Sequence, residues 1–233
     1  MSERYWAVVP AAGAGRRMGG AVPKQYLELL GRKVIDHSLR RLLDHPLIES
    51  VHVALAETDT RWASTEHADD SRVVRVTGGG ERCQSVLNAL RVLASSAERD
   101  DWVLVHDAAR PCLSAADLDN LIQQLKQHPV GGILGVPAHD TLKRVSSDGG
   151  IVETLPRSDL WHAYTPQMFR LGLLIEALEQ ALERGRLVTD DASAMELAGH
   201  RPMMIEGQAG NIKITRPADL PLAAFYLSLN HPA

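Results

Sequence analysis

Apolar residues fall in short runs that alternate along the chain with segments in which they recur at helical spacing. Five runs are typical of buried strands, at residues 5–10, 51–56, 72–76, 102–106 and 132–137. Helices are predicted at residues 34–43, 81–93, 115–128 and 171–184, with a short helix after Thr189 and a last one from Pro217. Strands and helices in alternation predict a parallel sheet covered by helices on both faces. The expected fold class is α/β, with a doubly wound, mostly parallel sheet.

The alternation of strands and helices changes between residues 138 and 160. Residues 141–146 and 151–155 flank the sequence S-D-G-G, which is typical of a hairpin turn. We therefore expect a β-arm inserted at about 138–160 into one domain spanning residues 1–233, and a further strand pair around 203–206 and 211–214. A hairpin of this length has little core of its own, so a partner surface is expected to hold it in a homodimer. An arm folded back on its own subunit is the alternative.

Composition excludes several classes of function. Hydrophobic residues make up 45% of the chain and charged residues 23%, as in globular proteins. The net charge of −4 and the aromatic content of 4% argue against a nucleic-acid partner. Cys83 and Cys112 have no C-x-x-C partner and fit reduced thiols. No signal-peptide core or membrane-spanning run is visible, so we expect a cytoplasmic protein with no membrane partner.

The segment P-A-A-G-A-G-R-R-M-G-G at residues 10–20 follows the first predicted strand, where a parallel sheet presents its ligands. A dinucleotide fingerprint is disfavoured because Met18 occupies its third glycine position, and a P-loop because Ala21 and Val22 replace its Lys-Ser/Thr pair. Small residues let backbone N–H groups approach an anion. Together with nearby Arg and Lys side chains they favour polyphosphate binding. A solvated turn with surface arginines is the alternative.

This segment and later blocks resemble the sugar-phosphate nucleotidyltransferases of the 2-C-methyl-D-erythritol 4-phosphate cytidylyltransferase family. The further blocks are P-K-Q-Y at 23–26, V-H-D-A-A-R-P at 105–111, D-T-L-K-R at 140–144, W-H-A-Y-T-P-Q at 161–167, T-D-D-A-S at 189–193 and N-I-K-I-T-R-P at 211–217. The resemblance implies a Rossmann-like nucleotidyltransferase fold. It also implies transfer of CMP from CTP to methylerythritol phosphate, with release of pyrophosphate and formation of 4-diphosphocytidyl-2-C-methyl-D-erythritol, an isoprenoid precursor.

The resemblance assigns roles to five charged residues. Arg17 and Lys24 would stabilise the transition state and the leaving pyrophosphate, while Arg157 and Lys213 would clamp the 4-phosphate of the acceptor. Positioning and charge stabilisation are the main requirements of such a transfer. Asp107 ends an apolar strand at the ligand edge of the sheet and looks like the ligand of Mg²⁺, which prefers hard oxygen atoms. A carboxylate that caps the next turn is the alternative interpretation of Asp107.

The remaining expected contacts come from the first loop, from the T-G-G-G-E-R-C-Q-S block at 77–85 and from the acceptor side. They are Pro10, Ala11, Ala12, Gly13, Gly15, Gly79, Gly80, Ser85, Arg110, Thr141 and Thr189. Cytosine carries an amine donor and two acceptors, so backbone groups and a hydroxyl suffice to bind it. Gly210 stands where relatives often have an acidic residue, and no second carboxylate ligand is assigned there.

Three other functions remain open at this point. A cytidylyltransferase for another polyol phosphate, such as ribitol 5-phosphate, would share Arg17, Lys24 and Asp107 and differ in the acceptor pocket. An NAD(P)-binding oxidoreductase is disfavoured by Met18 and by Pro23, which interrupts the expected first helix. A non-catalytic nucleotide-binding module is disfavoured because cations, a carboxylate and acceptor-clamp residues occur together.

Overall fold

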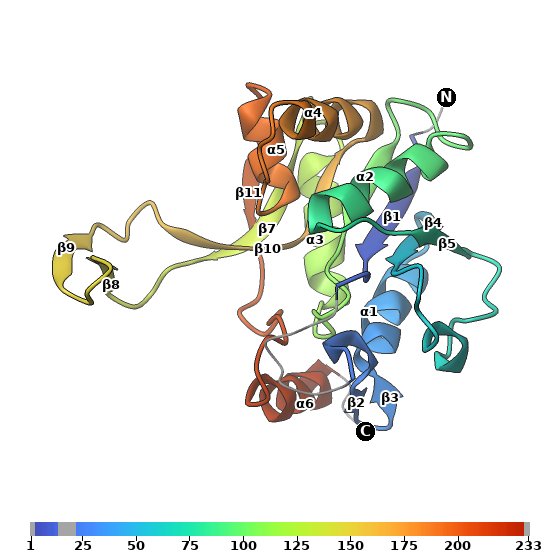
Figure 1. Cartoon of the computed structure of the whole chain (residues 1–233), viewed down its shortest axis with the longest axis horizontal. Coiled ribbons are helices and arrows are strands. Elements are labelled where there is room, and N and C mark those ends of the chain that lie inside the picture. Colours follow the sequence, from blue (N-terminus) through green and yellow to red (C-terminus); the bar gives the residue numbers. More distant parts are fainter. Residues whose placement is uncertain (1–2, 14–21, 231–233) are drawn as a thin grey trace.

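The protein is described by a computed structural model, which covers residues 3–13 and 22–230. Its centre is a seven-stranded sheet in the order β11-β7-β10-β6-β1-β4-β5 (Figure 1). The strands are β1 (Tyr5–Pro10), β4 (Ile48–Leu55), β5 (Val73–Thr77), β6 (Trp102–Val105), β7 (Gly131–Pro137), β10 (Trp161–Arg170) and β11 (Met203–Glu206). Neighbouring strands are parallel except for β10, which runs antiparallel to both β6 and β7. The predicted mostly parallel α/β sheet is therefore confirmed.

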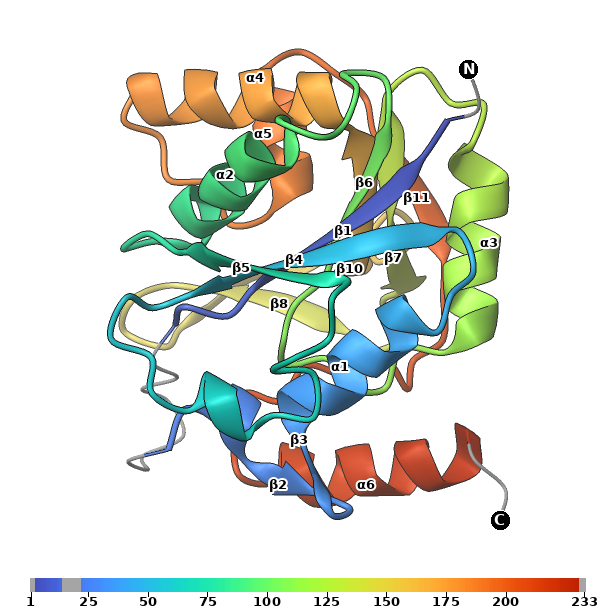
Figure 2. The same cartoon turned by 90° about the vertical axis from the view of Figure 1, so that its right-hand side faces the viewer.

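Helices cover both faces of the sheet (Figure 2). They are α1 (Val34–Leu43), α2 (Arg82–Leu93), α3 (Ala115–Leu125), α4 (Leu171–Glu183), α5 (Asp191–Leu197) and α6 (Asp219–Asn230). Alternate residues of β1 serve the two faces: Val9 belongs to the core shared with α1 and α3, and Val8 to the core shared with α2, α4 and α5. This period of two is the geometry of a strand buried on both sides. Within the described residues, no helix is long and apolar enough to cross a membrane.

The described segment from residue 22 to α1 lies beside the C-terminal helix (Figure 1). A 3₁₀ helix, η2 (Lys24–Tyr26), precedes a small hairpin of β2 (Glu28–Leu29) and β3 (Arg32–Lys33). Its two turn residues, Leu30 and Gly31, both have positive φ, as tight hairpin turns require. A second 3₁₀ helix, η3 (Trp62–Ser64), lies between β4 and β5. Leu29 of the hairpin packs in a third apolar cluster with residues of α6, so the C-terminal helix closes this side.

Two sequence predictions differ from the structure. Residues 211–214 form no strand: β11 pairs in parallel with β7, and the later segment is held by a hydrogen bond from the Ile214 N–H to the Ala109 carbonyl. Strand β10 was not predicted, because it contains Pro166, which cannot donate to a ladder. The structure accommodates Pro166 with a break in the pairing register between Ala163 and Gln167.

The hairpin predicted at 141–155 is present as β8 (Leu142–Val145) and β9 (Ile151–Leu155), which pair in antiparallel fashion as a separate two-stranded sheet. Gly149, with φ of +87°, supplies the turn. Figure 1 shows this hairpin at the end of two long connections, away from the seven-stranded sheet. Val145, Ile151 and Val152 on it are more than half exposed. The hairpin therefore has almost no core within its own chain.

Candidate active site

A pocket of about 340 Å³ lies at the carboxyl ends of β1 and β6. Ten of the residues predicted for the site line it: Pro10, Ala11, Ala12, Gly13, Lys24, Gly79, Gly80, Ser85, Asp107 and Lys213. They come from five separate segments of the chain. The segments after β1, β5 and β6 meet because the carboxyl ends of parallel strands lie at one edge of the sheet.

Four of the predicted site residues that the structure describes do not line this pocket: Arg110, Thr141, Arg157 and Thr189. Arg17 and Gly15 lie outside the described residues. Thr141 and Arg157 belong to the exposed hairpin region, where the Arg157 guanidinium donates to the His139 carbonyl. Thr189 is exposed on the segment before α5. These threonines and Arg157 are therefore not brought to the pocket of their own chain.

One wall of the pocket is a glycine turn packed closely against the loop after β1. A Cβ atom at position 78 would lie 2.5 Å from the Cβ of Ala12. This contact is too short for any side chain, so only glycine fits here. The Ser85 hydroxyl accepts the Gly79 N–H at 3.0 Å and donates to the Glu81 carbonyl at 3.1 Å. The turn is thereby held in shape, and it presents backbone groups and one hydroxyl to the pocket.

The loop after β1 is supported from below by a buried amide. Nε2 of Gln25 donates to the carbonyls of Ala11, at 2.8 Å, and Gly13, at 3.1 Å. The neighbouring Lys24 donates through Nζ to the Ile214 carbonyl at 2.9 Å. Residues 24 and 25 therefore connect the loop to the segment that carries Lys213. Two lysines thus reach the pocket from opposite parts of the chain.

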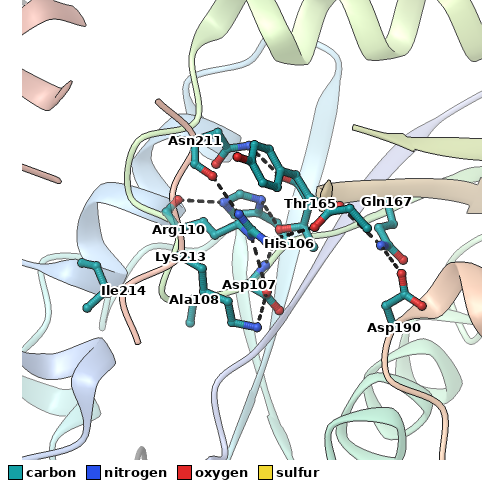
Figure 3. A network of polar contacts seen from close by, with 12 residues as sticks. His106, Asp107, Ala108, Arg110, Thr165, Gln167, Asp190, Asn211, Lys213 and Ile214 are labelled. Carbon is teal, nitrogen blue, oxygen red and sulfur yellow. Dashed lines mark hydrogen bonds and ion pairs between the residues drawn. The ribbon is translucent and has the colours of Figure 1, made fainter. Parts of the chain in front are cut away.

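Asp107 lies within reach of three cations, of which Arg110 and Lys213 are labelled in Figure 3. Its Oδ1 is 3.1 Å from Nε of Arg82, and its Oδ2 is 2.7 Å from Nζ of Lys213 and 3.6 Å from Nε of Arg110. Burial by itself would raise the pKa of the carboxyl, but the three cations outweigh it and hold the pKa of Asp107 far below its usual range. Asp107 is therefore ionised throughout the physiological range.

A buried polar network supports this carboxylate from behind (Figure 3). The Thr165 hydroxyl accepts the Asp107 N–H at 3.0 Å and lies 3.1 Å from Nδ1 of His106. Burial lowers the pKa of His106 to about 4, so its ring is neutral at pH 7. The Asn211 side-chain amide donates to the Thr165 carbonyl at 2.8 Å, and the Asn211 backbone carbonyl accepts from Nη1 of Arg110 at 2.7 Å. The network fixes the backbone of residues 106–110.

Arg110 belongs to this network rather than to the pocket surface. Its guanidinium is buried and stacks on the Tyr164 ring, with 4.6 Å between the Arg110 Cζ and the ring centroid. It also contacts Asp107 and the carbonyls of Asn211 and Ala163. Arg110 is not among the residues that line the pocket, and it reaches the site through its contact with Asp107.

Comparisons with known proteins identify the family. The IspD family model, 2-C-methyl-D-erythritol 4-phosphate cytidylyltransferase, matches residues 5–229. The chain belongs to this family. It is 57% identical over 217 residues to the 2-C-methyl-D-erythritol 4-phosphate cytidylyltransferase of Pseudomonas syringae pv. tomato, covering 93% of this chain and 92% of that protein. The Pseudomonas fluorescens SBW25 relative is 56% identical over 224 residues, covering 94% and 95%.

Solved structures agree with the sequence comparison. The Francisella tularensis 2-C-methyl-D-erythritol 4-phosphate cytidylyltransferase superposes with a TM-score of 0.84 at 38% identity, covering 96% of this chain and 100% of that one. The Thermus thermophilus protein of the same name gives 0.78 at 29% identity, covering 95% and 98%. The cytidylyltransferase class and the Rossmann-like nucleotidyltransferase fold that the sequence predicted are thereby confirmed.

Cytidylyltransferases handle a triphosphate, so the pocket has to be tested as a site for Mg²⁺. In the described part of the chain, no three His, Cys, Asp or Glu side chains gather into a metal site. Asp107 faces the pocket, but both of its oxygens are paired with cations. Protein-bound Mg²⁺ commonly uses one or two carboxylates together with substrate phosphates and waters. The residues fit an ion shared between Asp107 and a bound triphosphate, and they do not fit a resident metal centre.

Arg82 and Asp191 are among the residues that this cytidylyltransferase brings to the site and that its sequence did not predict. Arg82 lines the pocket, and its Nη2 donates at 2.8 Å to Oδ2 of Asp191, a fully buried residue. Burial works against the charge on Arg82, but attraction to Asp191 and Asp107 outweighs it and raises the pKa of the guanidinium. Both residues stand in quoted blocks, at 77–85 and 189–193. Their pairing across 109 positions leaves no local signal.

Proposed function

We propose that this pocket binds CTP and transfers its cytidylyl group to 2-C-methyl-D-erythritol 4-phosphate. A phosphate oxygen of the acceptor attacks the α-phosphorus of CTP. The bond from the α-phosphorus to the bridging oxygen breaks, and pyrophosphate leaves with that oxygen. The observation that carries the proposal is the convergence of Lys24, Lys213 and Asp107 with the glycine turn in one pocket, in a chain that belongs to the cytidylyltransferase family.

The two sides of the pocket suit the two ends of CTP. Backbone groups of Gly79 and Gly80 and the Ser85 hydroxyl offer both donors and acceptors, which is what the edge of cytosine requires. The loop after β1 and the Lys24 ammonium offer donors to a triphosphate, and we assign Arg17 to the same role. The chain needs no covalent nucleophile for this transfer, because positioning and charge stabilisation provide most of the catalysis.

Lys213 is proposed to orient the phosphate of the acceptor. Its side chain is about one third exposed and is held at 2.7 Å by Asp107, so its ammonium is directed while it still faces solvent. Asp107 is also the residue that would share Mg²⁺ with the triphosphate. When bound, the ion would neutralise phosphate charge. Lys24 and Lys213 would then hold opposite reactants in one pocket.

The hairpin of β8 and β9 is proposed to complete the site of a second subunit. Thr141 and Arg157, expected in the acceptor clamp, lie outside the pocket of their own chain, and the hairpin exposes apolar side chains. A homodimer that exchanges hairpins would cover those side chains and bring Arg157 toward the partner's pocket.

We place Thr189 on the acceptor side as well. The net charge of −4 gives no reason to expect nucleic acid, and a cytoplasmic location fits a substrate such as CTP.

An acceptor panel tests the assignment. Purified protein is incubated with CTP, Mg²⁺ and either methylerythritol phosphate or ribitol 5-phosphate, and pyrophosphate release is measured. We expect methylerythritol phosphate to support far faster release, with none when CTP or Mg²⁺ is omitted. Faster turnover with ribitol 5-phosphate would overturn the acceptor and leave the reaction class standing. If neither acceptor supports pyrophosphate release, both the acceptor and the reaction class are overturned.

A further inference from the structure

Arg82 occupies a position that its own helix does not explain. It is the first residue of α2, and a cation there is opposed by the positive end of the helix dipole. The helix is already capped by Glu81 and Gln84, whose side chains and backbone N–H groups bond reciprocally. Arg82 is therefore not needed to cap the helix. Its guanidinium turns to two carboxylates instead.

Those two carboxylates are far apart in the sequence, one after β6 and the other at the start of α5. Nε of Arg82 donates to Oδ1 of Asp107 at 3.1 Å, and Nη2 donates to Oδ2 of Asp191 at 2.8 Å. The Asp191 side chain is completely buried, and its Oδ1 has no hydrogen-bond partner among the described residues. A buried carboxylate with one strong partner is costly to leave unpaired. Asp191 therefore holds Arg82 firmly, while Asp107 faces the pocket.

Asp191 is itself held in place by the sheet. Oε1 of Gln167, on β10, accepts the N–H groups of Asp191 and Ala192 at 2.9 Å each, and its Nε2 donates to Oδ2 of Asp190 at 2.9 Å (Figure 3). Gln167 pairs with Val105 at the end of β6. The start of α5 is thereby hydrogen-bonded to β10, which is the neighbour of β6, and β6 leads into Asp107. Arg82 joins Asp191 at the start of α5 to Asp107.

We propose that Arg82 is a positioning residue: anchored by buried Asp191, it fixes Oδ1 of Asp107 so that Oδ2 is directed at Lys213. Without Arg82 the carboxylate is free to rotate between Lys213 and Arg110, and the ammonium of Lys213 loses its fixed aim. This inference rests on the cytidylyl transfer proposed above, in which Lys213 orients the acceptor phosphate. Its consequence falls on turnover and on the acceptor. Affinity for CTP changes little.

Four single variants and one double variant test the coupling. Arg82→Met keeps the length and removes both bonds, Arg82→Lys keeps a charge that reaches one carboxylate, and Asp191→Asn removes the charge of the anchor. Arg91→Met is the matched control. Arg91 lies on the same helix and pairs at 2.8 Å with Glu179 on α4, and both side chains of this pair are more exposed than those of Arg82 and Asp191. Each is assayed for kcat, for KM of CTP and of the acceptor, and for Tm.

We expect Arg82→Met to lower kcat on the order of 10²-fold, as misplacement of reacting groups does, with KM for CTP changed by less than about threefold. Arg82→Lys recovers part of the loss, and Asp191→Asn causes a smaller fall in kcat. The double variant Arg82→Met with Asp191→Asn is no slower than Arg82→Met alone, because residues that act through one another are not additive. Arg91→Met turns over like the unmodified protein.

Three results would overturn the proposal. They are a normal kcat in Arg82→Met, a rise in KM for CTP at unchanged kcat, which makes Arg82 a nucleotide ligand, and additive losses in the double variant. Should Arg82→Met fail to fold, Arg82→Lys, Asp191→Asn and their double variant carry the same additivity test. Turnover by the unmodified protein is the reference. Its absence overturns the proposed function as well, whereas normal turnover that Arg82→Met leaves unaffected overturns only this inference.

Discussion

The charge of Asp107 should be worth more to the fold than any carboxylate on the surface. Asp107→Asn keeps the shape of the side chain and removes its charge. The variant leaves Arg82, Arg110 and Lys213 facing one another, with the nearest cation at 2.7 Å from the lost charge. Asp107 and Arg110 are both buried, so water from the pocket replaces the missing anion only in part. The expected result is a loss of stability together with a loss of activity.

The size of the stability loss follows from the geometry. Removing one partner of a buried ion pair costs about 3–5 kcal/mol. Lys213 is about one third exposed and can turn toward solvent, so we take the lower end, roughly 3 kcal/mol. For a chain of 233 residues, each kcal/mol lowers Tm by about 2–4 °C, which gives a fall of about 6–12 °C. Asp44→Asn is the control, because its pair with Arg40 is exposed, and it should change Tm by about 2 °C at most.

Lowering the pH should reduce the difference in stability between the unmodified protein and Asp107→Asn. The folded pKa of Asp107 lies far below its usual range, so its stabilisation is complete above the unfolded pKa of about 4 and is lost as the pH falls below it. At pH 3 the advantage of the unmodified protein over Asp107→Asn should be about 1 kcal/mol smaller than at pH 7. Thermal and urea unfolding measure this. A fall in Tm no larger than that of Asp44→Asn would refute the reasoning. An unchanged Mg²⁺ dependence of residual activity would remove Asp107 from the metal site.

Three further predictions concern other parts of the molecule. Burial lowers the pKa of His52 to about 4 from 6.5, so the unfolded chain binds a proton first, and His52 alone lowers stability by about 2 kcal/mol at pH 5 relative to pH 8. His52→Leu should remove this part of the fall in Tm and leave the part that His106 contributes, and an unaltered profile would contradict this. Arg17→Ala and Lys24→Ala should each lower kcat by ~10²-fold or more with a smaller change in CTP affinity, and near-normal kcat would exclude a role in the transition state. Chains carrying Arg157→Ala, refolded with chains carrying Lys24→Ala, should recover roughly a quarter of the unmodified activity if hairpins are exchanged, and no recovery in proven heterodimers would exclude shared sites.

Local patterns were enough to find most of the elements and most of the pocket. The bounds of β1 and α1 agree with the prediction at both ends, because each depends on the apolar spacing within one short window. Ten predicted residues line one pocket, since the resemblance assigns them all to one site and three of their segments follow β1, β5 and β6 at the same sheet edge. The strand prediction for residues 211–214 was wrong because alternating apolar side chains also occur in extended segments that pair with no other strand.

Only the tertiary structure decided which charges meet. Asp107 is bound by cations at positions 82, 110 and 213, and Arg82 by a carboxylate at position 191. Strand β10, which the sequence did not predict, lies between β6 and β7 and supplies Gln167 and Thr165 behind the carboxylate. Local propensity acts over a few residues, whereas ion pairs depend on strand order and burial. The chain therefore encodes its site residues locally, and their partners are set by the order of the strands in the sheet.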